Sequence, residues 1–480
     1  MDFDVVVIGS GMFGTSAAKH IKAQNPALNV LLLGPWNPAL GRSDFFSSHD
    51  DVSRLYRHQI GAPDISSVFE APLSPSDLDQ LSSSQFWSRV SSASIRRFDS
   101  IAAESSVPFH HPVGFLAVGH SSSPYMDALL RSASSKSVTD PVVMFRGYDD
   151  AFHSSFPYIL SPQQSLRSAE YTEPNPVPLI PPSSFAAVHL PANAGYLNPL
   201  ALISAQRQIF TNIGGHTLDS SLCTAITQAA DHVLVWYRPA ASISFDGTSP
   251  PPLKCGRVLL AAGAFSQTVP VSAFSPSDSA AAEMPQQGDA IDCLSLHPKT
   301  QVVALFEVSV HDVEVTLKGM PTIIYAGLTK GQGGAEEELD SAYVLPPIYY
   351  APEKKWYVKI GHGKRLEEGL EATAGADLQS WYTARSETTG STSYSPSIAP
   401  PSSDAPARAL YHLFRRLFPT VSPLSVNFLN AGLTADTEDG KPCIRMGAGG
   451  LSRIGVCTGG NGYGAKACDE IGRLAAELFR

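Results

Sequence analysis

The sequence predicts an α/β fold made of two regions, and three observations carry this prediction. Residues 4–8 form a run of β-formers that leads into a glycine-rich turn and an alanine-rich helical stretch to about residue 23. Residues 455–479 repeat that order of strand, glycine-rich turn and helix. Residues 291–413 are dominated by strand patterns. We therefore expect a parallel sheet with helices, assembled from both ends of the chain, and a second, strand-rich region.

The first glycine-rich turn has the spacing G-x-G-x-x-G at Gly9, Gly11 and Gly14. In a strand-turn-helix unit the three glycines allow the tight turn, the approach of a pyrophosphate and close helix–strand packing. The phosphates would lie at the helix N-terminus, where free N–H groups favour negative charge. The pattern indicates a Rossmann-like dinucleotide site rather than a turn without a ligand, and it leaves FAD and NAD(P) both open.

The second predicted strand, residues 29–33, ends without the acid that commonly holds a nucleotide ribose. Gly34 and Pro35 occupy that place. We expect the ribose to be held elsewhere, for example by Ser43 or Asp44 in the next loop.

The elements that follow alternate between helix and strand patterns. A serine- and proline-rich stretch without long periodicity separates residue 119 from residue 191. Helices are expected over 85–104, 200–213 and 407–418, and strands over 113–119, 216–222, 233–237 and 257–265.

Two sets of basic residues stand out as candidates for chemistry. Arg54 and Arg57 lie three apart, and they share a face if this stretch begins a helix; a solvated helix face is the alternative. Residues 344–350 and 356–362 predict a β-hairpin in which Lys359 and Tyr357 share a face. A lysine at a sheet edge is the simpler interpretation of Lys359 taken alone.

Composition narrows the class of protein. The 480-residue chain carries a net charge of −10, which disfavours nucleic acid and anionic membranes as partners. Its six cysteines form no C-x-x-C pair, so we expect no metal site and no disulfide framework. No apolar stretch is long enough for a membrane span and no secretory leader is apparent, so we expect a cytoplasmic protein. A monomer and a dimer remain equally open.

Several short motifs, taken together in their order, resemble the D-amino-acid oxidase superfamily of FAD enzymes, in particular its monomeric sarcosine oxidase and fructosyl-amine oxidase branch. The resemblance covers most of the chain in patches. The motifs that carry it are Gly9–Gly14, Ser48–Arg57, Gly195–Pro199, Leu260–Phe265, Ile348–Tyr350 with Lys359–Gly361, and Gly459–Tyr463.

The resemblance implies two domains and a reaction. Residues 1–110, 190–288 and 406–480 would form a discontinuous FAD-binding domain, and residues 111–189 and 289–405 a substrate-binding domain with a mixed sheet. The enzyme would oxidise a C–N bond of an amine or amino acid, possibly a secondary or N-substituted one, to an imine and reduce O2 to H2O2. A flavin dehydrogenase with another acceptor and an NAD(P)-dependent dehydrogenase are the alternatives.

The resemblance also implies roles for individual residues. Arg57 would grip a substrate carboxylate with its guanidinium fork, and Tyr350 would lie over the substrate. Lys359 would stabilise the negative charge that develops on O2. The catalytic candidates are Lys359, Arg54, Arg57, Tyr350 and His362. The cofactor-binding candidates are Gly9, Ser10, Gly11, Met12, Phe13, Gly14, Ser48, Ser53, Arg54, Leu222, Ala262, Gly263, Gly460, Asn461, Gly462 and Tyr463.

Departures from the family pattern concern the tether and the substrate. Gly432 stands where the sarcosine oxidase branch has the cysteine that binds FAD covalently, so we expect non-covalent FAD, with Cys443 or Cys457 as alternative tethers. Asp50 replaces a histidine. Gly464 falls where a lysine helps to bind the substrate carboxylate, and Lys466 lies two residues further on. His362 comes one residue before the family's histidine position, Gly363.

Overall fold

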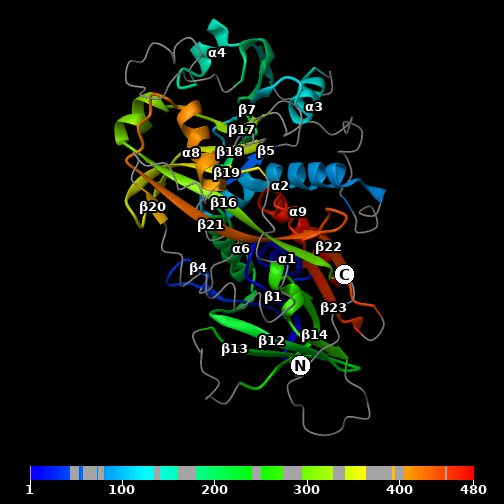
Figure 1. The fold of residues 1–480 in the computed structure, drawn as a ribbon. Helices are drawn as coiled ribbons and strands as arrows, with labels where there is room; N and C mark the ends of the chain where they lie inside the picture. Colours follow the sequence, from blue (N-terminus) through cyan, green and yellow to red (C-terminus); the bar gives the residue numbers. More distant parts are fainter. Residues whose placement is uncertain are drawn as a thin grey trace.

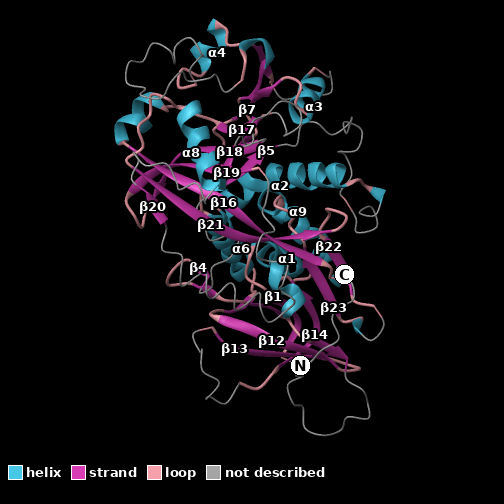
Figure 2. Ribbon diagram, in the orientation of Figure 1, coloured by secondary structure: helices cyan, strands magenta, loops and turns pink. Residues whose placement is uncertain are grey.

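The computed structural model describes residues 2–43, 53–57, 73, 80–134, 141–159, 180–240, 250–273, 294–327, 341–363, 392–394, 405–448 and 451–480. Within these residues two large sheets lie toward opposite ends of an elongated molecule, and a group of helices lies between them (Figures 1 and 2). Segments from both termini meet in the lower half of Figure 1, where the dark blue and red parts of the chain run side by side.

The first sheet has a parallel centre. Strand β1 (Phe3–Ile8) lies between β2 (Val30–Leu33) and β14 (Leu253–Leu260), and all three run parallel. The parallel set continues through β11 (His216–Leu218) beside β2 and β23 (Ile454–Thr458) beside β14. Antiparallel strands extend the sheet: β13 (Val233–Pro239), β12 (Ser221–Gln228) and β22 (Cys443–Met446), with β15 (Val271–Ala273) parallel to β12.

The two faces of this sheet pack against different layers because side chains alternate along each strand. Val5 and Val7 pack against helices, and Val6 and Ile8 pack against the antiparallel strands β12 and β13. The helices between the sheets are α1 (Met12–Gln24), α2 (Ser83–Ser105), α6 (Pro199–Asn212) and α9 (Gly464–Ala476).

The second sheet is mixed and has the order β20-β21-β16-β19-β18-β17-β7-β9-β8. Only β17 and β7 are parallel neighbours among its described strands. Helix α8 (Ala405–Leu417) packs on its outer face through a core that includes Phe306, Phe414 and Val358. Its strands are β7 (Phe115–His120), β8 (Val143–Arg146), β9 (Phe185–Leu190), β16 (Leu296–Val308), β17 (Thr322–Ala326), β18 (Ser341–Tyr350), β19 (Lys355–His362), β20 (Thr392–Tyr394) and β21 (Ser425–Thr437).

Smaller elements complete the described fold. A three-stranded sheet of β5 (Arg54–Arg57), β10 (Ala194–Leu197) and β6 (His110–His111) lies between the large sheets. Helices α3 (Pro124–Ala133) and α4 (Asp150–Ser155) lie at the far end of the second sheet (Figure 1). The remaining short elements are β3 (Trp36–Asn37), β4 (Arg42–Ser43) and the helical turns Pro182–Ser184, Gly263–Thr268, Asp312–Thr316 and Glu477–Phe479.

The predicted fold class is confirmed, because a Rossmann-like parallel sheet is joined to a second, mixed sheet. Three local expectations differ. The stretch at Arg54–Arg57 is a strand rather than a helix start, because it pairs antiparallel with β10. The strand expected over 216–222 divides into β11 and β12 at Ser220, whose φ is +46°. Strand β21 belongs to the second sheet and helix α8 packs on that sheet. The chain therefore returns to the first sheet after Thr437 rather than near residue 406.

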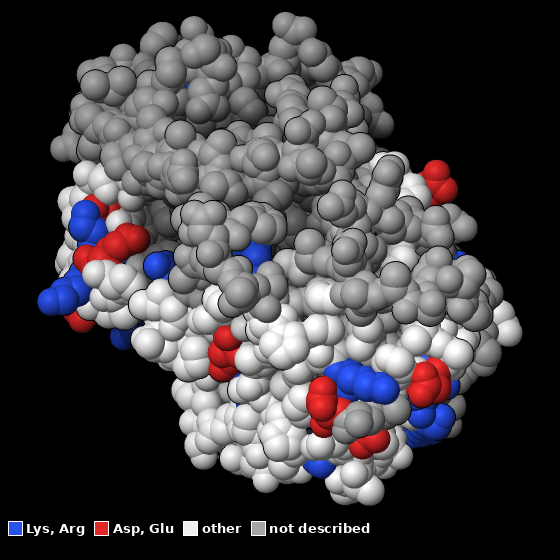
Figure 3. Space-filling view, turned by 90° about the horizontal axis from the view of Figure 1, so that it is seen from below, with Lys and Arg blue, Asp and Glu red and all other residues white. Residues whose placement is uncertain are grey.

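The described surface seen in Figure 3 carries acidic and basic side chains mixed together over the lower part of the view. Among the described helices, none has the length and apolar character needed to cross a bilayer.

Candidate functional site

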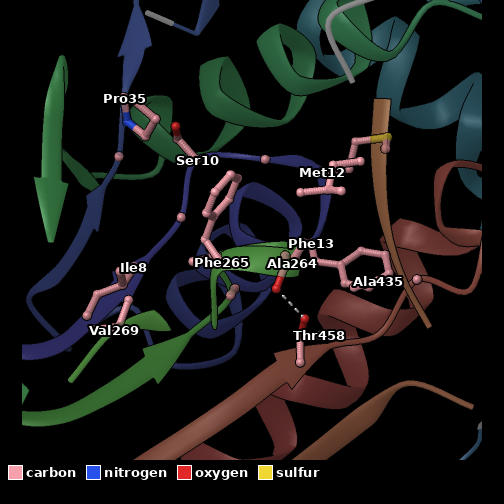
Figure 4. A pocket seen from close by; sticks show the side chains of 18 of the residues that line it. Ile8, Ser10, Met12, Phe13, Pro35, Ala264, Phe265, Val269, Ala435 and Thr458 are labelled. Atoms are coloured by element: carbon pink, nitrogen blue, oxygen red, sulfur yellow. Dashed lines mark hydrogen bonds between the residues drawn. The ribbon is translucent and has the colours of Figure 1, made fainter. Parts of the chain in front are cut away.

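A cavity of about 380 Å³ opens where the parallel strands of the first sheet end. The turns that follow β1, β2, β14 and β23 all contribute to its wall, together with residues 433–435 of β21. Ligands of open parallel sheets bind at this carboxyl edge of the strands. Figure 4 shows Ser10 and Pro35 at one end of the cavity and Met12, Phe13 and Ala435 toward the other.

The first glycine-rich turn is a cradle that has no room for side chains. Gly9 has a φ of +111°, and a Cβ there would lie 2.3 Å from the carbonyl oxygen of Ala261. A Cβ at Gly14 would lie 1.7 Å from the Gly9 carbonyl oxygen. These two glycines therefore let β1, α1 and the end of β14 close together. The exposed backbone of this turn is what the pyrophosphate of a dinucleotide requires.

Two helices present their N-termini to this cavity without side-chain caps. The first turn of α1 starts after Gly11, and that of α9 starts after Tyr463; neither N-terminal residue makes a side-chain capping bond. Neither first turn contains an acid. Gly11, Met12, Gly464 and Ala465 line the cavity. The free N–H groups and the positive ends of both helix dipoles thus favour an anionic ligand here.

The absence of an acid after β2 has a steric reason. A Cβ on Gly34 would lie 2.4 Å from Oγ of Ser10 and 2.6 Å from its Cβ. Ser10 is buried, lines the cavity and occupies the space of the missing side chain. The expectation that Ser43 or Asp44 holds the ribose stays a prediction, because their side chains are not among those that the structure describes. Ser10 is instead the polar side chain that the structure places beside Gly34.

The structure brings most of the predicted cofactor-binding residues to one wall. Tyr463 and Gly14 do not line the cavity, and Asn461 has a supporting role: its Oδ1 accepts a hydrogen bond from Thr437 N at 2.9 Å, and its Nδ2 donates to Gly459 O at 2.7 Å. Ser48 lies outside the described residues. The predicted residues that line the cavity are Gly9, Ser10, Gly11, Met12, Phe13, Arg54, Leu222, Ala262, Gly263, Gly460 and Gly462.

Two predicted cations meet at one carbonyl group. Nη1 of Arg54 donates to the carbonyl oxygen of Ser53 at 2.8 Å, and Nζ of Lys359 donates to the same oxygen at 3.1 Å. Arg54 lines the cavity, whereas Lys359 is 1% exposed. Oγ of Ser53 is buried without a hydrogen-bond partner. The Ser53 peptide therefore fixes a lysine of the second sheet beside the wall of the cavity.

The face of β19 that carries Lys359 also carries aromatic residues. Tyr357 and Tyr350 pack edge to face at 5.2 Å, in a cluster with Leu305, and the ring of Tyr343 lies 5.9 Å from Nζ of Lys359. Gly361 makes room for that ring, since a Cβ there would lie 2.1 Å from it.

His362 does not join this group. Side chains alternate along β19, so His362 lies on the face opposite Lys359, where its register partner Ala342 belongs to the outer core. The structure therefore gives no support to the predicted catalytic role of His362.

Arg57 lies away from Arg54, because residues three apart on a strand point to opposite faces. Its guanidinium carbon lies 4.8 Å from the ring of Phe115 and 5.6 Å from that of Tyr125. Lys466, in the first turn of α9, is buried, with Nζ 5.1 Å from the Tyr463 ring. Burial, and then the charge of Arg57, lowers the pKa of Lys466 to about 7. Within the described residues neither cation has an acidic partner.

Sequence reasoning missed several residues of the cavity. Gly34 and Pro35 follow a predicted strand of the parallel sheet, so their place at the carboxyl edge was available as a signal. Others, such as Arg238, come from the antiparallel strands and carry no motif. The missed lining residues are Ile8, Leu33, Gly34, Pro35, Ser221, Cys223, Thr224, Arg238, Ala261, Ala264, Phe265, Thr268, Val269, Leu433, Thr434, Ala435, Thr458, Gly459, Gly464 and Ala465.

The cysteines give no support to a covalent tether. Cys443 and Cys457 are not among the residues that line the cavity, and Gly432 lies in β21, just before the lining residues 433–435. Cys223 does line it, but burial raises the pKa of its thiol to about 12, and Sγ lies 3.6 Å from Ala225 O. A thiol in that state is a poor nucleophile.

Comparisons with known proteins agree with this geometry. A family model described as FAD dependent oxidoreductase matches residues 4–317. A comparison with curated protein sequences gave no significant match.

Solved structures resemble the chain over its whole length at low sequence identity. Fructosyl amine:oxygen oxidoreductase (Amadoriase I) from Aspergillus fumigatus has a TM-score of 0.59 at 15% identity, covering 99% of this chain and 86% of that one. L-proline dehydrogenase from P. horikoshii has 0.59 at 13%, covering 100% and 93%. Glycine oxidase from Geobacillus kaustophilus has 0.55 at 12%, covering 99% and 94%. At these identities the likeness concerns the fold.

Proposed function

This chain belongs to the family of FAD-dependent oxidoreductases, and we propose that it is an oxidase of an amine or amino acid that carries a carboxylate. FAD is therefore its cofactor, which argues against the alternative of an NAD(P)-dependent dehydrogenase. When bound, FAD would accept a hydride from the carbon beside the amine nitrogen and pass the electrons to O2, giving an imine and H2O2.

The residues present fit FAD. The cradle at Gly9 and Gly14 would receive the pyrophosphate, since a Cβ at either position would strike backbone atoms. The uncapped N-termini of α1 and α9 would offer N–H groups to its anionic parts. Ser10 would take the ribose contact that an acid at Gly34 has no space to make. Attachment without a covalent bond is consistent with the absence of Cys443 and Cys457 from the cavity wall.

Arg57 and Lys466 would hold the substrate carboxylate. Both are buried, and Nη1 of Arg57 lacks a hydrogen-bond partner. A buried cation without a counter-ion is unfavourable, and a lysine in the first turn of a helix is further opposed by the helix dipole. An anionic substrate would relieve both penalties. Gly464 lies where the family's lysine was expected, and Lys466 supplies a cation from the same turn.

Lys359 would promote the reduction of O2. Its ammonium is buried and is held by the carbonyl oxygen of Ser53, next to Arg54 in the cavity wall. A fixed cation in a water-poor site stabilises negative charge that develops on O2 more strongly than a solvated one. This placement of Lys359 is the observation that carries the oxidase proposal.

The test compares reduction of the flavin with its reoxidation. The protein is loaded with FAD, and candidate amines and amino acids are screened for bleaching of the flavin absorption without O2 and for H2O2 release in air. Lys359→Met should slow reoxidation by at least about 100-fold while reduction changes far less. Lys355→Met, at the exposed start of the same strand, is the matched control.

The outcomes separate the remaining alternatives. Flavin reduction without H2O2 would indicate a dehydrogenase with another acceptor. Reoxidation that is equally fast in Lys359→Met and in the native protein would refute the role of Lys359. A flavin that no amine or amino acid reduces would refute the proposed function as a whole.

A further inference from the structure

One buried hydroxyl beside Arg57, that of Tyr125, has a proton that no described group accepts. The hydroxyl is buried next to the Arg57 guanidinium, which can only donate to it; Nη1 of Arg57 is also buried without a partner. The two side chains are neighbours, with the Arg57 guanidinium carbon 5.6 Å from the Tyr125 ring centre. Leaving such groups unsatisfied is costly, and native structures seldom tolerate it without a reason. Two adjacent unsatisfied donors point to a ligand that accepts from both.

Helix α3 fixes the position of Tyr125. Ser123 caps the helix by accepting a hydrogen bond from Met126 N at 3.3 Å, and Pro124 occupies the first turn. Met126 and Leu129 pack in a core with Phe115 of β7, and the same Phe115 ring contacts Arg57. The hydroxyl and the guanidinium group are thus held by one packed unit. Figure 1 shows α3 beside β7 at the end of the second sheet.

The charge around the hydroxyl suits a donor rather than an acceptor. Burial raises the pKa of Tyr125, and this outweighs the opposing effect of Arg57, so the phenol stays protonated. Its one proton can then be donated. Among the described residues, no acid is paired with Arg57 or Lys466 to compete for that bond.

We propose that Tyr125 is a third donor to the anionic group of the substrate, acting with Arg57 and Lys466. The site would thereby select a substrate whose anionic group accepts hydrogen bonds on more than one oxygen, over its neutral amide. This inference rests on the carboxylate site of the proposed function. It adds α3 to the elements that decide which substrates bind.

The test uses the FAD-loaded protein with benzoate and benzamide as probes. Binding of each is followed by the change in flavin absorption, so no turnover is needed. Tyr125→Phe should weaken benzoate binding by about tenfold, the effect of one hydrogen bond to a charged group, and leave benzamide binding unchanged. Tyr158→Phe is the matched control: its hydroxyl is also buried without a partner, but it lies in the outer core of the second sheet.

The results that would overturn the inference are distinct. Unchanged benzoate binding in Tyr125→Phe would do so, and so would an equal loss in Tyr158→Phe. If Tyr125→Phe did not fold, a crystal structure of the native holoprotein with benzoate would decide, through the presence or absence of a hydrogen bond from the phenol to the carboxylate. Failure of every amine to reduce the flavin would reject the oxidase proposal, yet would leave the benzoate comparison to stand or fall alone.

Discussion

Helices α1 and α9 begin differently from α2, α3, α4 and α6. Ser82, Ser123, Asp149 and Asn198 cap α2, α3, α4 and α6 through side-chain hydrogen bonds. The first turns of α1 and α9 have no such bond and face the cavity. Capping stabilises a helix by about 1 kcal/mol. The two helices that lack it are those whose free N–H groups can serve a ligand, and they must be stabilised by other contacts.

The largest expected effect concerns those other contacts. Asp469 of α9 is fully buried and binds Lys19 and His20 of α1 and Arg97 of α2. Asp469→Asn would leave the buried Lys19 ammonium uncompensated, while Arg97 would keep its pair with Glu470, so the free energy of unfolding should fall by about 3–5 kcal/mol. Urea unfolding would measure this loss of stability.

The control is Asp127→Asn in the capped helix α3, where an exposed pair with Arg131 is lost and the cost should be under about 1 kcal/mol. Equal losses in the two variants would show that the uncapped helix α9 does not depend more on its ion pairs than a capped helix does.

A second prediction concerns the turn that precedes α1. Gly9→Ala would drive a Cβ into the Ala261 carbonyl group at 2.3 Å, so FAD affinity should fall by about 100-fold or more, close to 3 kcal/mol. The flavin-to-protein absorbance ratio after gel filtration would show it. Gly319→Ala controls for a general loss of stability from a side chain at a positive φ, because Gly319 has a φ of +73°, a Cβ there meets nothing within 4 Å, and it lies outside the cavity wall. Normal FAD retention in Gly9→Ala would contradict the prediction that FAD binding needs a glycine at this position.

The third prediction concerns the first turn of α9, through Lys466. Burial and Arg57 hold the pKa of Lys466 at about 7, below its ordinary value, so the side chain is charged below that pH and neutral above it. Benzoate stays ionised between about pH 6 and pH 9. Its affinity should therefore fall by about tenfold as the pH rises through 7. Lys466→Met should give a flat profile across this range; a sloping one would assign the effect to a group other than Lys466.

The smallest effect is expected at a capped helix. Asn198 Oδ1 accepts a hydrogen bond from Ala201 N at 3.2 Å at the start of α6, which lies outside the cavity wall. Asn198→Ala should lower the free energy of unfolding by about 1 kcal/mol and leave FAD affinity unchanged. Thermal unfolding and FAD titration would measure the two. Asn198→Ser should retain most of the stability, and a large loss of FAD affinity in Asn198→Ala would show that a capped helix also serves the cofactor.

The sequence predicted the parts of the site that local patterns encode. The turns at Gly9–Gly14 and Gly459–Gly464 were predictable because strand, turn and helix follow one another directly in the chain. The fit of Ser10 against Gly34 was not, since it depends on how close two neighbouring turns lie. The spacing of Arg54 and Arg57 left a helix start open, and only pairing with β10 makes this stretch a strand.

The group around Arg57 was beyond local reasoning for a related cause. Arg57 comes from β5, Tyr125 from α3 and Lys466 from α9, and no spacing connects these segments. Their meeting depends on the packing of the small sheet and α3 against the second sheet, which no single stretch of sequence specifies. His362 shows the reverse case. Its place in the chain suggested a catalytic role, but side chains alternate along β19, so His362 lies on the face opposite Lys359.

The packing of α1 on α9 has a consequence for how the protein is made. Lys19 and Asp469 are 450 residues apart in the chain, and β23 completes the parallel set beside β14. During synthesis the first glycine-rich turn leaves the ribosome long before its partner helix exists. The apolar face of α1 and Lys19 stay uncovered until α9 has been synthesised, and apolar surface exposed in this way makes a folding chain prone to aggregation. The cavity is therefore complete only once β23 and α9 are present, so the cofactor would bind after these segments have been synthesised.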